Sequence, residues 1–94
     1  MYMRITTGRF DPAKSEEVVG LTGEVSAALS QLPGFQHLHQ GVDRNAGMAV
    51  VVSIWDTEEH ARFSRDALGD VINRLQAAGA QLDPPQIYEI VTEG

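Results

Sequence analysis

The residues best suited to chemistry in this sequence are its three histidines. His37 and His39 are separated by one residue, Leu38. If this segment is a strand, both imidazoles point to the same face, about 7 Å apart. Such a pair could bind a divalent metal, but no third ligand stands at a recognised spacing, and we predict no metal site. Either histidine could instead be a general base toward a phenol or enol. The alternative is two hydrogen-bonded polar residues at an interface or its rim.

Three further residues are candidates for a site. His60 lies in the first turn of a predicted helix, where the positive dipole end favours the neutral imidazole, and it is the third candidate base. Trp55 could stack on a flat aromatic ligand, although a core anchor is the simpler interpretation. Arg9 could orient an anionic substrate, and a salt bridge is the alternative.

The composition excludes several classes of site and partner. There are no cysteines, hence no disulfide, thiolate metal site, iron–sulfur cluster or cysteine nucleophile. Glycine-rich nucleotide motifs and nucleophile elbows are absent, and we expect no cofactor of that type. The net charge of −6 and the scattered basic residues argue against nucleic acid or an anionic membrane as partner. No signal-like or membrane-spanning segment is present, which predicts a cytoplasmic protein.

The 94 residues, 43% of them hydrophobic, predict one domain over 1–94. Hydrophobic periodicity and turn signals divide the chain into strands and helices in the order βαββαβ. The expected elements are strand 2–10, helix 13–31, strands 36–42 and 48–55, a second helix, and strand 86–92. Asp56 and Glu59 form a predicted capping box at the start of the second helix, and Gly69 is expected to kink or split it. This order predicts an α+β, ferredoxin-like fold: a four-stranded antiparallel sheet with two helices on one face.

The hairpin between the middle strands fixes which side chains share a face. A loop over 43–47 would pair Val42 with Met48. His37, His39, Ser53 and Trp55 would then lie on one face of the sheet, and a one-residue change in the loop would reverse this.

Strand 48–55 is apolar on both faces, which predicts that both faces are shielded from water. Helices can cover only one of them, and an exposed apolar sheet face is larger than monomers usually tolerate. We therefore predict a homodimer that packs sheet against sheet. Loops or the C-terminal tail covering that face are the alternative.

Two phrases of the sequence point to a known family. Leu32-Pro33-Gly34-Phe35 precedes the second strand, and Ser53-Ile54-Trp55-Asp56-Thr57-Glu58-Glu59-His60-Ala61 joins the third strand to the second helix. With the element order, these resemble the antibiotic-biosynthesis monooxygenase family of the dimeric α/β-barrel superfamily. The resemblance covers nearly the whole chain.

The resemblance implies a cofactor-independent monooxygenase acting on an electron-rich aromatic or quinol-type molecule. Relatives of that kind use neither metal nor flavin, because the deprotonated substrate supplies the electrons. It also implies a cavity for a small hydrophobic or aromatic ligand between sheet and helices, with walls that include Leu21, Val25, Phe63 and Ala67.

Other functions are compatible with the same fold. One alternative is a non-catalytic, ligand-binding or stress-related homodimer, and another is an isomerase- or lyase-like enzyme with a histidine base. The haem-degrading branch of the family uses an Asn in the first strand and a helical Trp and a His further on. The first strand here has no Asn, and residues 61–79 contain neither Trp nor His, so haem degradation is not expected.

Overall fold

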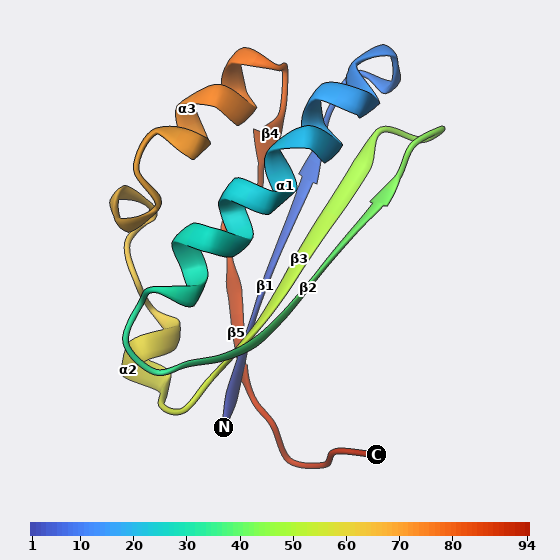
Figure 1. Ribbon diagram of the computed structural model, residues 1–94. Coiled ribbons are helices and arrows are strands. Elements are labelled where there is room, and N and C mark those ends of the chain that lie inside the picture. The colour runs from blue at the N-terminus through green and yellow to red at the C-terminus, as the bar shows by residue number, and fades with distance from the viewer.

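The computed structural model describes residues 1–94, and its strands form one antiparallel sheet (Figure 1). The central strand β1, Tyr2–Arg9, pairs along its length with β3, Met48–Trp55. Strand β2, Phe35–Asp43, lies on the other side of β3. The remaining edge of β1 pairs with two short strands, β4 (Gln81–Leu82) and β5 (Gln86–Glu89). The order β2-β3-β1-β4/β5 confirms the predicted ferredoxin-like α+β class.

The C-terminal strand differs from the predicted single strand 86–92. It begins earlier, with β4, and ends at Glu89. Pro84 and Pro85 lie between the two pieces, and because proline has no backbone N–H it cannot donate to the sheet at these positions.

Helix α1, Ser15–Ser30, agrees closely with the predicted helix 13–31. It follows a short 3₁₀ turn, η1 (Pro12–Lys14), whose first turn is capped by the Asp11 side chain. Both α1 and α3 lie on the same face of the sheet (Figure 1). None of the helices combines the length and the apolar character needed to cross a membrane.

The predicted second helix is three separate segments. They are α2 (Glu58–Ala61), a 3₁₀ turn η2 (Arg65–Leu68) and α3 (Asp70–Ala77). The residue that caps α2 is Thr57, whose side chain accepts from the third backbone N–H beyond it, and the predicted cap at Asp56 is wrong.

A buried arginine organises the break after α2. Arg4 Nη1 donates to the carbonyl oxygens of Ala61 and Phe63, both at 2.9 Å. Ala61 is the last residue of α2, where a helix leaves its carbonyl acceptors unpaired, and Phe63 lies two residues beyond it. Ser64 then caps η2, and Gly69 adopts a φ of 63° between η2 and α3, which a residue with a side chain rarely does.

The hairpin register differs from the predicted one by one residue. Asp43 pairs with Met48, and Val42 pairs with Ala49. Strand β2 continues to Asp43 because its side chain and carbonyl accept N–H bonds from the loop, including the Gly47 N–H at 2.9 Å.

This shift moves both strand histidines to the other face. His37 pairs with Ile54 and His39 with Val52, so both imidazoles lie on the face away from the helices. The prediction that they share a face with Ser53 and Trp55 is wrong, because side chains alternate and a one-residue slip exchanges the faces.

A bulge between Phe35 and His37 restores the expected pairing at the end of the strand. Phe35 lies opposite Trp55, as predicted, with ring centroids 5.7 Å apart in an edge-to-face arrangement.

The two faces of the sheet have different surroundings. The inner face packs under the helices, where Trp55 is fully buried within a core of ten residues. No helix lies on the outer face, and its apolar side chains are only partly buried. These are Met3, Ile5, Val50, Val52 and Ile54, while Met48 at the end of the row is exposed.

Candidate functional site

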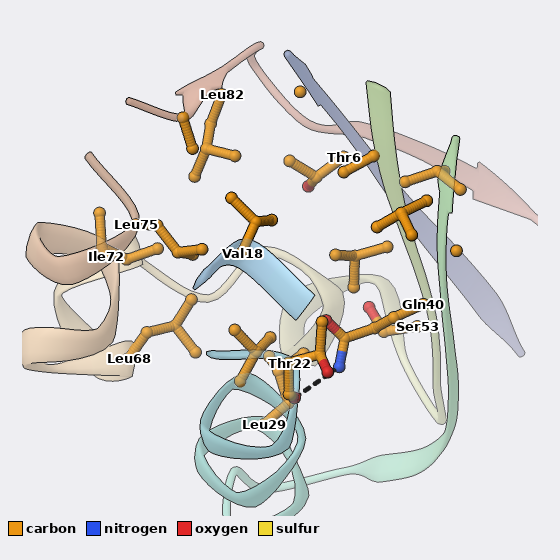
Figure 2. A pocket seen from close by; sticks show the side chains of 18 of the residues that line it. Thr6, Val18, Thr22, Leu29, Gln40, Ser53, Leu68, Ile72, Leu75 and Leu82 are labelled. Atoms are coloured by element: carbon orange, nitrogen blue, oxygen red, sulfur yellow. Dashed lines mark hydrogen bonds between the residues drawn. The ribbon is translucent and has the colours of Figure 1, made fainter. Parts of the chain in front are cut away.

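A cavity of about 90 Å³ lies between the inner sheet face and the helices (Figure 2). Hydrophobic residues form 14 of its 23 lining positions. One water needs about 10–15 Å³ on this scale, so the space exceeds that of a packing defect. The wall from the helices includes Val18, Thr22, Val25 and Leu29 of α1, Arg65 and Leu68 of η2, and Ile72 and Leu75 of α3.

The polar groups on the sheet side are held by specific partners. Gln40 reaches across from β2, and its Nε2 donates to the Thr22 carbonyl of α1 at 2.8 Å (Figure 2). Ser53 is 2% exposed, and its hydroxyl accepts the indole N–H of Trp55 at 2.8 Å. Every side-chain nitrogen and oxygen that is fully shielded from solvent has a hydrogen-bond partner.

A positive charge is buried in the same wall. Arg4, in the middle of β1, is 6% exposed and makes the two carbonyl bonds that end α2. Its guanidinium carbon also lies 3.8 Å from the centroid of the Phe63 ring. Burial first, and then the charge of Arg65, lower the pKa of Arg4 from its usual value, although a guanidinium remains protonated at physiological pH.

Three of the predicted substrate-binding residues line the cavity: Val25, Phe63 and Arg9. Arg9 is largely exposed and faces Asp83 at 3.8 Å, so it stands at the margin. The predicted positions Leu21 and Ala67 are not among the lining residues.

Trp55 lies behind this wall, buried beneath the cavity. Its ring contacts Phe35 and Phe63, with centroid distances of 5.7 and 5.1 Å, and its N–H is used by Ser53. This position is that of a core anchor, and stacking of Trp55 on a ligand stays a prediction.

The candidate bases do not come together. His37 and His39 share a hydrogen bond between their Nε2 atoms at 3.1 Å on the outer face. His60 lies on α2, with its Nδ1 2.7 Å from Asp56 Oδ1, and this hydrogen bond is the main cause that lowers the pKa of Asp56. None of the three lines the cavity, and nowhere do three or more metal-ligating side chains group together.

The sequence interpretation missed Arg4 and Arg65 as site residues and counted them only among the scattered basic residues. The sequence did contain an indication that Arg4 is buried. Arg4 lies between the apolar residues Met3 and Ile5 in a predicted strand. Both faces of a central strand in a small α+β domain are at least partly covered, so a charge there is placed where burial is costly.

The fold has close counterparts among solved structures. SnoaB, described as a cofactor-independent oxygenase from Streptomyces nogalater, matches with a TM-score of 0.71, 14% identity, and coverage of 98% of this chain and 94% of that one. The monooxygenase ActVA-Orf6 of Streptomyces coelicolor, solved with the ligand nanaomycin D, matches with a TM-score of 0.69 and 20% identity. The match covers 99% of this chain and 88% of that one. A structure described as an antibiotic biosynthesis monooxygenase matches with a TM-score of 0.70 and 16% identity. The match covers 98% of this chain and 100% of that one.

The chain has the antibiotic biosynthesis monooxygenase fold. The resemblance expected from the sequence is thereby confirmed at the level of architecture. No protein-family model matches the sequence, and no curated protein matches it significantly. At the identities found, the structural likeness concerns the fold, and the activity has to be argued from the site.

Proposed function

We propose that the protein is a homodimeric, cofactor-independent monooxygenase that oxidises an electron-rich aromatic or quinol-type molecule in the cavity beneath the helices. The observation that carries the proposal is the cavity itself, an apolar space with few, well-held polar groups. The proposal is also supported by the structural comparison, because one protein of this fold is described as a cofactor-independent oxygenase.

In the proposed reaction, the substrate loses a proton and its electron-rich ring carbon reacts with dioxygen. A CH₂ carbon of an anthrone becomes C=O, one oxygen atom stays in the product, and the other leaves with the two hydrogens as water. The dry apolar wall favours this by keeping water from the reacting carbon.

A non-catalytic ligand-binding function is the second candidate, and one observation favours it. The cavity lining includes no His, Asp, Glu, Cys, Lys or Tyr, and therefore no ordinary general base. His37, His39 and His60 remain proposed bases only if the assembled or ligand-bound protein brings one of them to the substrate.

The homodimer is part of the same proposal. Its support is the row of partly exposed apolar side chains on the outer sheet face, which includes Val50, Val52 and Ile54. The cytoplasmic location inferred from the sequence stays a prediction.

Dioxygen uptake with anthrone and with 1,4-dihydroxynaphthalene tests the activity. We expect uptake by wild type above the uncatalysed rate, and a large loss in Ala49→Leu, because Ala49 lines the cavity and a leucine would fill it. Ala77→Leu is the matched control, since Ala77 is exposed on α3. His37→Ala, His39→Ala and His60→Ala show which histidine, if any, takes the proton. Binding of these compounds without any uptake would replace the oxygenase by the ligand-binding function.

A further inference from the structure

Arg4 has more hydrogen-bond donors than the protein uses. A guanidinium carries five N–H groups, and the two hydrogen bonds that Arg4 makes both come from Nη1, to the carbonyls of Ala61 and Phe63. Nε and Nη2 bond to no protein atom, yet no shielded side-chain nitrogen in the chain lacks a partner. These donors must therefore reach open space, and Arg4 borders the cavity.

The pairing of the other arginines sets Arg4 and Arg65 apart. The chain has six arginines, and four of them pair with carboxylates. The two without a carboxylate partner, Arg4 and Arg65, both line the cavity. Arg65 donates instead to the Asp83 carbonyl at 2.8 Å.

The cavity is thus positive inside a protein of net charge −6. Its lining holds three arginines and no Asp or Glu, and Arg9 is already offset by Asp83. Arg4 and Arg65 line the same cavity, so their like charges repel each other, and the burial of Arg4 removes much of the water that would screen its charge. A buried charge without a counter-ion is costly, and an anion between the two would relieve that cost.

We propose that the cavity binds its ligand as an anion, with a carboxylate or an ionised phenol or enol oxygen held by Arg4 and Arg65. The aromatic character of this ligand rests on the proposed function, whereas its charge rests on the two arginines alone. For a phenol or enol, the O–H bond breaks, the electron pair stays on the oxygen facing Arg4, and the proton passes to water. The arginines then make a substrate acidic in a cavity that contains no base.

Calorimetric titration with benzoate and its neutral isostere benzamide tests the charge directly. We expect wild type to bind benzoate at least about tenfold more tightly, as a hydrogen bond to a charged group implies. Arg4→Met should remove most of that preference and leave benzamide binding nearly unchanged. Arg62→Met is the matched control, because Arg62 pairs with Glu58 on the surface and should keep the wild-type preference.

Arg65→Met provides a second variant that keeps both carbonyl bonds of Arg4, should Arg4→Met fold poorly. It should also weaken benzoate more than benzamide. Equal affinity of wild type for the two compounds, no benzoate binding at millimolar concentration, or a preference retained in Arg65→Met and in folded Arg4→Met would overturn the proposal.

A phenol probe distinguishes the two sources of the anion. Bound 4-nitrophenol should ionise about one to three pH units below the free compound, measured by the absorbance of the phenolate. A lowered value supports a phenol or enol ligand, whereas an unshifted value with tight benzoate binding assigns the site to carboxylates. Neither titration involves dioxygen, so absence of uptake with anthrone would reject the oxygenase while leaving the anion site standing.

Discussion

Ile54 and Trp55 are neighbours on β3, but they face opposite sides of the sheet and opposite surroundings. The inner side combines a fully buried indole, whose N–H is bonded to Ser53, with a buried arginine that keeps donors free toward the cavity. The outer side has an apolar middle beside the His37–His39 pair, carries Thr7, Asp43 and Gln86 toward its ends and edge, and is covered by no helix. The inner face therefore has the character of a cavity wall, whereas the outer face has that of a surface which the proposed second copy would cover.

The largest effect is expected on the inner face, from Trp55→Ala. Loss of a fully buried tryptophan costs about 3–5 kcal/mol of the free energy of unfolding, a large part of the total for a domain of this size. Urea denaturation at a fixed protein concentration measures it. Trp55→Phe, which keeps a ring against Phe35 but loses the N–H to Ser53, should cost less. A Trp55→Ala loss below about 1 kcal/mol would contradict the assignment of this residue as the core anchor.

On the outer face, Val52→Asp should change assembly and leave the protomer folded. Val52 lies in the apolar row, and a carboxylate there would lose its water between two copies, at a cost that the neighbouring His39 imidazole would offset only in part. Sedimentation should show two chains for wild type and one for the variant, with unchanged circular dichroism and unchanged benzoate binding per chain.

Ala27→Asp is the control for Val52→Asp, because it places the same charge on the exposed side of α1. It should leave the two-chain species intact. A single chain for wild type at micromolar concentration, or a dimer that Val52→Asp does not disturb, would remove the difference in role between the two faces.

The elements of the fold were predictable because they depend on local patterns. The apolar stripe of α1 and the two-sided apolar character of β3 both follow from periodicity, and both are present. The hairpin register was not predictable at the same level. Whether the strand includes Asp43 depends on one side chain accepting the loop N–H groups, and that single residue decides the face of His37 and His39.

The site was less predictable than the fold, because burial of a charge depends on distant segments. Arg4 becomes enclosed only when the chain folds back and the carbonyls of Ala61 and Phe63 accept hydrogen bonds from it. These residues lie 57 and 59 positions away in the sequence. The same contact ends α2, so the break in the second helix and the buried charge have one cause. Periodicity gave no sign of a break before Gly69, because it does not register an arginine from another strand.

The smallest expected effect belongs to the Asp56–His60 pair, which lies at the exposed start of α2 and outside both faces. The hydrogen bond from His60 lowers the pKa of Asp56 in the folded protein below its unfolded value of about 3.9. Its stabilisation is therefore fully present above the unfolded pKa and is lost as the pH falls through the folded pKa.

The difference in free energy of unfolding between wild type and Asp56→Asn should then be small and positive at about pH 5, and should shrink as the solution becomes more acidic. Denaturation midpoints measured across this acidic range provide the comparison. Glu59→Gln is the control, because it removes a neighbouring exposed carboxylate that forms no ion pair. The difference in free energy of unfolding between this variant and wild type should not change with pH over the same range. A difference for Asp56→Asn that grew on acidification would mean that the carboxylate is destabilised by folding, and the hydrogen bond from His60 could not be its dominant interaction.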